Sequence, residues 1–239
     1  MLQALDFVLR LIRPKPPKKL YLVSSLPLTY NELLHKSYQM TKAPLPTNFL
    51  KHTSKNLIQK FLINNFYSTL IALSKPLSPK TILDAGCGEG FSMNKLSLNG
   101  IGEKIEGVEY SKEAISFGKK LFPDLTFSQG SIYELPYKDN SFDLVICTEV
   151  LEHLEEPEKA LKEILRVSKK YLIISVPNEP LFTMSNFLRG KNLSRLGNDE
   201  GHINHWNPLS FTKYLKKNGL KIKKLRLPFP WITILGEKQ

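Results

Sequence analysis

The feature that most constrains this chain of 239 residues is the stretch Thr81–Gly90, TILDAGCGEG. A short apolar, β-prone run ends in an aspartate, three alternating glycines follow, and Phe91–Leu96 then predicts the start of a helix. A strand, a glycine turn and a helix in this order form the first half of a nucleotide-binding βαβ unit. Glycines allow the backbone to turn tightly and allow a ligand to lie against it without a Cβ in the way. The stretch therefore predicts a parallel α/β sheet with a ligand site at its glycine turn.

The spacing of the glycines narrows the class of ligand. It is G-x-G-x-G, whereas a dinucleotide site has G-x-G-x-x-G and a phosphate loop ends in Gly-Lys-Ser/Thr. The turn has no lysine, and Glu89 would repel a phosphate. The pattern favours a ligand that is not a polyphosphate and disfavours a nicotinamide oxidoreductase. A glycine turn with no special use is the alternative that the turn alone leaves open.

The residues after the turn predict a continued alternation of strands and helices. Lys104–Tyr110 predicts a second strand that ends at Glu109, where one carboxylate can accept hydrogen bonds from both hydroxyls of a ribose. Ser111 predicts the cap of the next helix. Further strands are expected at 125–129, 140–147 and 170–176, helices at 157–167, 181–188 and 208–218, and a closing antiparallel pair at 220–227 and 231–235.

The motif D-A-G-C-G-E-G after a strand resembles the first motif of the class I S-adenosylmethionine-dependent methyltransferases, and Glu109 resembles the acidic residue of their second motif. The resemblance covers about residues 81–176. It implies a Rossmann-like α/β fold with a seven-stranded, mostly parallel sheet, an antiparallel C-terminal strand and helices on both faces. It also implies S-adenosylmethionine as cofactor. The cofactor-binding residues that it suggests are Asp84, Gly86, Cys87, Gly88, Glu89, Gly90, Glu109, Tyr110, Ser111, Gly130, Ser131, Ile132, Cys147 and Thr148.

One position departs from the family pattern. The third strand is usually followed by G-D-x-x-x-L-P, whose Asp hydrogen-bonds the adenine amino group, and here Ser131 replaces that Asp. A serine is shorter and uncharged but can still accept a hydrogen bond.

Candidate catalytic and metal-binding groups follow the fourth strand. The segment E-x-x-E-H offers Glu149, Glu152 and His153, and a later loop carries His202 and His205. The candidate bases are His153, His205 and Glu149, since an imidazole titrates near neutral pH. Carboxylates with imidazoles also suit magnesium, manganese or zinc, and the candidate ligands are Glu149, Glu152, His153 and His202. The layout resembles the small-RNA 3′-end 2′-O-methyltransferases and the ubiquinone-pathway O-methyltransferases. The alternative is that no metal binds and His153 packs under the acceptor pocket.

The flanks differ from the centre in charge. Residues 1–80 hold 12 Lys and Arg against 2 Asp and Glu, and residues 191–239 hold 10 against 3, within a net charge of +12. We expect a basic N-terminal helical extension or cap at 1–52 and the methyltransferase domain at 53–239, with one helix over Thr53–Ser74 capped by Ser54. Residues 1–19 could contact a membrane surface, although packing on the protein's own core is preferred. Two cysteines without C-x-x-C spacing and no run long enough to span a bilayer suggest reduced thiols in a cytoplasmic protein.

These observations favour an enzyme that methylates an oxygen of a small or lipid-like acceptor. A metal-assisted RNA 2′-O-methyltransferase that holds phosphates with its basic flanks is the alternative, and a non-catalytic cofactor-binding domain that acts through a partner is another. The acceptor pocket is expected in the least regular segments, 1–52 and 177–210. Its aromatic rim would draw on Phe182, Trp206, Phe229 and Trp231, of which Trp231 is more simply explained as core.

Overall fold

The structure is a computed structural model that describes residues 47–239 except 189, 191 and 200. The described residues belong to one compact unit. The predictions for residues 1–46, which include most of the basic N-terminal extension and the membrane contact through 1–19, lie outside the described residues.

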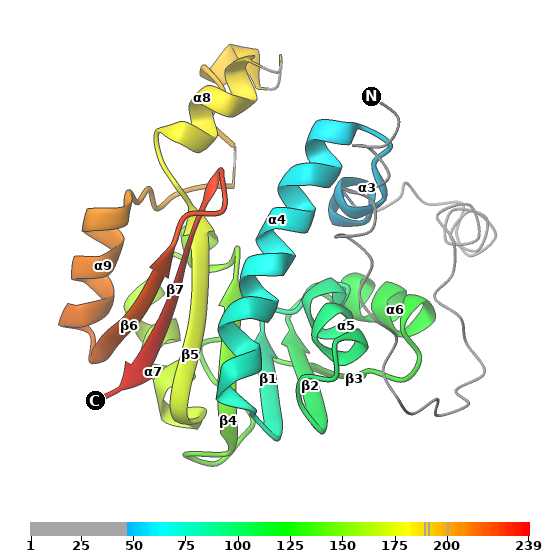
Figure 1. Cartoon of the computed structure of the whole chain (residues 1–239), viewed down its shortest axis with the longest axis vertical. Helices are drawn as coiled ribbons and strands as arrows, with labels where there is room; N and C mark the ends of the chain where they lie inside the picture. Colours follow the sequence, from blue (N-terminus) through cyan, green and yellow to red (C-terminus); the bar gives the residue numbers. More distant parts are fainter. Residues whose placement is uncertain (1–46, 189, 191, 200) are drawn as a thin grey trace, which may run out of the picture. The chain divides into compact units, whose positions relative to one another are not determined.

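The domain is built on a seven-stranded sheet with the order β3-β2-β1-β4-β5-β7-β6 (Figure 1). Neighbouring strands from β3 to β5 are parallel, and β7 is antiparallel to both β5 and β6. This confirms the predicted fold, including the closing antiparallel pair. The strands are β1 (Thr81–Ala85), β2 (Lys104–Glu109), β3 (Thr126–Gln129), β4 (Phe142–Thr148), β5 (Ser168–Pro177), β6 (Leu220–Arg226) and β7 (Trp231–Lys238).

The strand order fixes where a ligand can bind. The chain moves from β1 to β2 and β3 on one side, and then returns to place β4 and β5 on the other side of β1. Loops leaving β1 and β4 therefore turn in opposite directions and leave a crevice between them. In open α/β sheets this switch point, at the carboxyl ends of the strands, is where ligands bind.

The helices cover both faces of the sheet because side chains alternate along each strand. On one face Ile82, Leu144 and Ile146 pack against α4 (Leu57–Ser74). On the other face Leu83, Val145 and Cys147 belong to the core that includes α7 (Pro157–Val167) and α9 (Pro208–Lys217). Each such buried Leu, Ile or Val contributes about 1.5–3 kcal/mol. The remaining helices are α5 (Phe91–Leu98), α6 (Lys112–Leu121) and α8 (Leu181–Leu188), with short 3-10 turns at Lys75–Leu77, Leu151–His153 and Leu193–Arg195.

The predicted single helix over Thr53–Ser74 is wrong at its start. A separate helix, α3, covers Thr47–Thr53, and α4 begins only at Leu57. The cap is Asn56, whose side chain accepts the N–H of Gln59 at 3.0 Å. Ser54 Oγ instead accepts the N–H of Asn56 at 3.2 Å, which holds the link between the helices in an extended form. Among the described residues, no helix has the length and apolar character needed to cross a membrane.

Candidate functional site

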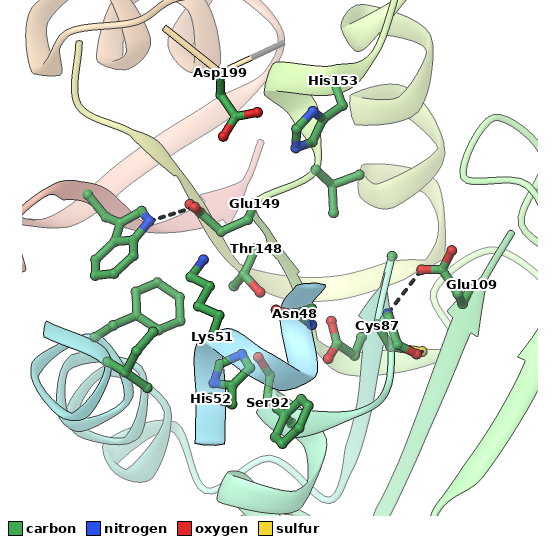
Figure 2. Close-up of a pocket in the computed structure, with 18 of the residues that line it drawn as sticks. Asn48, Lys51, His52, Cys87, Ser92, Glu109, Thr148, Glu149, His153 and Asp199 are labelled. Carbon is green, nitrogen blue, oxygen red and sulfur yellow. Dashed lines mark hydrogen bonds between the residues drawn. The ribbon is translucent and has the colours of Figure 1, made fainter. Parts of the chain in front are cut away.

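A cavity of about 920 Å³ lies in the crevice that the strand order creates. Its walls come from the glycine turn after β1, the ends of β2 and β4, the helices α3, α4 and α8, and the start of β7. Figure 2 shows side chains from these elements converging on one space. The volume of the cavity is large enough for two small molecules, since sites for single drug-sized ligands begin at about 300 Å³.

Most of the residues predicted to bind a cofactor line this cavity. They are Asp84, Gly86, Cys87, Gly88, Glu109, Tyr110, Gly130, Ile132 and Thr148. They come from four separate segments of the chain. The parallel pairing of β2, β1 and β4 brings them together because it places the ends of these strands at one edge.

Glu109 anchors the glycine turn at one end of the cavity. Its Oε2 accepts the N–H of Gly88 at 3.0 Å (Figure 2). Its Oε1 accepts the N–H of Ser111 at 2.9 Å. Gly88 has a φ of +52°, which a residue with a side chain rarely adopts. Each carboxylate oxygen has two lone pairs and uses one here, so Glu109 retains acceptors for a ligand.

Asp84 lies at the base of the cavity as a buried carboxyl group. It is 1% exposed, and neither of its oxygens has a hydrogen-bond partner among the described residues. Burial, with a further contribution from the charge of Glu109, raises the pKa of Asp84 to about 8. A buried acceptor without a donor costs free energy, and a ligand that brings a cationic donor would relieve this cost.

Five of the predicted cofactor residues do not line the cavity. The Glu89 carboxylate accepts a hydrogen bond from Nδ2 of Asn48 at 2.6 Å, and Gly90 is the N-cap of α5. The Ser111 hydroxyl caps α6 by accepting the N–H of Ala114 at 3.1 Å. Ser131 accepts the N–H of Tyr133 at 3.2 Å within its own turn, and Cys147 is fully buried in the core. These residues shape the turns and core that surround the site.

Glu149 lies in the second half of the cavity in a strained conformation. Its φ is +59°, in the left-handed region, and such strain is found mainly where the surrounding structure enforces it. Trp231 Nε1 donates to its Oε2 at 2.5 Å, while Oε1 is buried without a partner among the described residues. Burial raises the pKa of Glu149, and the positive charge of Lys51 opposes this.

Three of the predicted metal ligands form a cluster beside the cavity. Glu152, His153 and His202 each offer one ligand atom, and these atoms lie within 4.8 Å of one another. Glu152 is 1% exposed, and both of its oxygens lack a partner among the described residues. Burial and the nearby Glu149 raise its pKa well above the usual value. Glu149, the fourth predicted ligand, is outside this group.

The structure gives the two candidate histidine bases different surroundings. His153 lines the cavity, and its Nδ1 lies 2.7 Å from the carbonyl oxygen of Gly201. Because a carbonyl can only accept, this contact assigns the proton to Nδ1 and leaves Nε2 as an acceptor. Burial lowers the pKa of His153. His205 is exposed and does not line the cavity. The next residue, Trp206, is instead buried against Phe211.

Helix α3 contributes cavity residues that the sequence analysis did not single out. Asn48, Lys51 and His52 all line the cavity, and the Lys51 ammonium points toward Glu149 and Thr148 (Figure 2). Burial, and then the charge of Lys51, lowers the pKa of His52 to about 3. A helix of seven residues without a repeating apolar pattern gives no signal for these positions, beyond the general expectation that 1–52 contributes to the pocket.

The aromatic rim is only partly as predicted. Phe182 and Trp231 line the cavity, whereas Trp206 and Phe229 do not. Trp231 is also buried in the core beside α4, so both interpretations of this residue apply. Trp206 packs between α9 residues instead.

Comparisons with known proteins point to one family. Residues 83–174 match the family described as "Methyltransferase domain". The chain is 28% identical over 113 residues to a "probable S-adenosylmethionine-dependent methyltransferase" of Mycobacterium tuberculosis, covering 46% of this chain and 40% of that one. It is 32% identical over 113 residues to norajmaline N-methyltransferase of Rauvolfia serpentina, covering 45% and 36%. The chain therefore spans well under half the length of these relatives.

A solved structure extends the likeness in fold to most of the chain. Magnesium protoporphyrin IX methyltransferase from Synechocystis, with S-adenosylhomocysteine bound, aligns with a TM-score of 0.57 and 18% identity over 86% of this chain and 94% of that one. The segment that matches the methyltransferase family, residues 83–174, holds the glycine turn, Glu109 and the E-x-x-E-H segment. The sequence motif, the sheet order and the match of residues 83–174 together support a class I S-adenosylmethionine-dependent methyltransferase domain in this chain.

Proposed function

We propose that this protein transfers the methyl group of S-adenosylmethionine to an oxygen of a small, largely apolar acceptor bound in the same cavity. The observation that carries the proposal is the continuity of the cavity. It joins the glycine turn and Glu109 to a second chamber walled by Phe182, Trp231 and His153. A donor in the first chamber would place its reactive group against an acceptor in the second.

The residues of the first chamber fit S-adenosylmethionine. The ammonium of its amino-acid part would supply the donor that the Asp84 carboxyl lacks. The remaining lone pairs of Glu109 would accept from the ribose hydroxyls. Ser131 lies outside the cavity lining, and its neighbours Gly130 and Ile132 flank the place where the base would lie. The bound molecule supplies a methyl group that its sulfonium already activates.

The chain's own task is then to align the acceptor and remove its proton. A hydroxyl must lose its proton on attack, and Nε2 of His153 is an unprotonated acceptor facing the cavity. Because the pKa of His153 is lowered, the imidazole is neutral and able to accept at pH 7. Since a neutral amine needs no such base before attack, His153 supports transfer to oxygen. By its name, one relative acts on nitrogen.

Calorimetric titration with S-adenosylhomocysteine tests the donor site without knowledge of the acceptor. We expect saturable one-site binding to the wild type and loss of most affinity in Glu109→Ala. The matched control is Glu103→Ala, because Glu103 is exposed at the start of β2 and remote from the cavity lining. A wild type that gives no heat of binding would refute the proposed function.

A second candidate, metal-assisted methylation of a ribose hydroxyl in RNA, is favoured by the Glu152, His153 and His202 cluster. Carboxylate and imidazole ligands suit a magnesium, manganese or zinc ion, which would polarise the hydroxyl. In this case Nε2 of His153 would hold the ion and could not act as the base. Manganese binding measured by electron paramagnetic resonance, in wild type and Glu152→Gln, separates the candidates. One bound ion that Glu152→Gln removes would support the metal, and no bound ion would eliminate it.

A further inference from the structure

Helix α8 leaves most of its large apolar side chains exposed. Its buried residue is an asparagine, Asn186, while Met184, Phe187 and Leu188 are 52%, 44% and 76% exposed. A helix at the surface of a domain normally turns its apolar stripe inward and its polar residues outward. These exposed apolar side chains indicate that the outer face of α8 meets something other than water.

The first two turns of α4 show the same exposure. Leu57, Ile58 and Phe61 are 80%, 62% and 69% exposed, although the rest of the helix buries its apolar residues against the sheet. The three positions fall on one face because they are spaced one and three residues apart. A second group of large apolar side chains therefore faces outward.

The two helices that carry these groups line the same cavity through other side chains. Gln59, Leu62 and Ile63 of α4 and Phe182 and Asn186 of α8 line it. Figure 1 shows α8 and the N-terminal part of α4 both extending beyond one end of the sheet. We call the exposed residues the mouth rim, which consists of Leu57, Ile58, Phe61, Met184, Phe187 and Leu188.

The charges near the rim indicate the kind of surface it meets. No Asp or Glu occurs between Glu32 and Asp84, so α3 and α4 carry no negative charge at all. Exposed Lys55 and Lys60 flank the apolar residues of α4. Helix N-termini usually favour acidic residues, and their absence from the first turn of α4 leaves that end positive. The rim thus combines apolar side chains with positive charge, which suits an anionic lipid surface.

We propose that the mouth rim rests on an anionic lipid bilayer, so that an amphiphilic acceptor enters the cavity directly from the membrane. This proposal rests on the proposed function, because it takes the molecule that enters from the membrane to be the methyl acceptor. A rigid protein partner that covered both helices would close the space between them, whereas a fluid bilayer would itself contain the acceptor. Leu62 and Ile63 of α4 and Phe182 of α8 give the cavity apolar walls, and the same two helices carry the exposed apolar side chains of the rim.

The test is cosedimentation of the full chain with unilamellar vesicles of phosphatidylcholine alone or with 30% phosphatidylglycerol added. Two double variants, Ile58→Gln with Phe61→Gln and Met184→Gln with Phe187→Gln, remove one side of the rim each. We expect each to lower the partition coefficient about tenfold or more on the anionic vesicles. The matched control is Leu209→Gln, because Leu209 is 84% exposed on α9 and outside the rim and the cavity lining.

The outcomes separate the rim from other routes to the membrane. Reduced binding in both double variants, with the control unchanged, supports the proposal. Binding that all variants retain would overturn it and assign the contact to residues outside the rim, such as 1–19. No vesicle binding by the wild type would also overturn it and indicate a protein partner or a second copy on the rim. Calorimetry with S-adenosylhomocysteine on the same variants distinguishes a failure of this proposal from a failure of the proposed function. If the donor site did not exist, every variant would lack a heat of binding.

Discussion

The buried carboxyl of Asp84 should lower the stability of the unliganded protein, although the same group is proposed to help bind the ligand. The folded-state pKa is about 8 against an ordinary value of 3.8. Between these values the folded state holds a proton that the unfolded state has lost, so stability falls as pH rises from about 4 to about 8. Each pH unit costs about 1.4 kcal/mol, which reaches on the order of 5 kcal/mol at pH 8.

Asp84→Asn removes the titration while keeping the shape of the side chain. The unliganded variant should therefore be more stable than the wild type, by a margin that grows through this pH range and is constant above it. From pH 5 to pH 8 the margin should widen by about 4 kcal/mol, or roughly 10 °C in melting temperature for a domain of this size. The assay is thermal unfolding followed by circular dichroism at unit steps of pH from 5 to 9.

Comparison with Asp124→Asn provides the control, because Asp124 is exposed and should give no pH-dependent margin. The same Asp84→Asn variant should bind S-adenosylhomocysteine about tenfold to a hundredfold more weakly, since it loses a charged acceptor for the ammonium. If wild type and Asp84→Asn melt with the same pH profile, the carboxyl ionises freely and the argument from its burial is refuted.

Three further substitutions test the surroundings of the site. Glu109→Ala should lower affinity for S-adenosylhomocysteine about tenfold to a hundredfold in calorimetry, because it removes the acceptor for the N–H of Gly88 as well as the proposed ribose contact. Gly107→Ala should destabilise by about 1–3 kcal/mol in urea unfolding, because an added Cβ would lie 2.5 Å from the sulfur of Cys87 in the glycine turn. Arg166→Ala should cost about 2–3 kcal/mol in the same assay, because its guanidinium donates to two carbonyls and two carboxylates.

Each of these changes has an outcome that would contradict it. Glu103→Ala should bind as the wild type does, so equal losses in both glutamate variants would make the Glu109 effect nonspecific. A Gly107→Ala protein of unchanged stability would mean that the turn moves away without cost. Arg226→Ala serves as the comparison for Arg166, since Arg226 is exposed and its guanidinium bonds only to the adjacent carbonyl among the described residues.

Local patterns predicted the sheet, and they brought nine of the predicted cofactor residues to the lining of one cavity. The strand ends at Asp84, Glu109 and Thr148 come together because parallel pairing follows from the alternation of strands and helices, which is visible in the sequence. Spacing alone therefore placed these residues at one edge. It could not show that Ser131 would turn its hydroxyl into its own loop, because that depends on the hydrogen bond to the Tyr133 N–H.

The rest of the cavity depends on contacts that no local pattern contains. The bond between Trp231 and Glu149 joins residues 82 positions apart, and the one between Asn48 and Glu89 spans 41. The boundary between α3 and α4 likewise depends on whether Ser54 or Asn56 caps, and both are good capping residues. The sequence thus limited the choices at these places, and the tertiary structure decided between them.

The position of β7 implies an order of assembly for the cavity. Although β7 follows β6 in the chain, it lies between β5 and β6, so β6 cannot join the sheet before it. Trp231, at the start of β7, forms a wall of the cavity beside Glu149 and donates the hydrogen bond that the Glu149 carboxylate accepts. A folding chain can therefore form the walls at the ends of β1, β2 and β4 first, and it closes the cavity beside Glu149 only when its last strand joins the sheet.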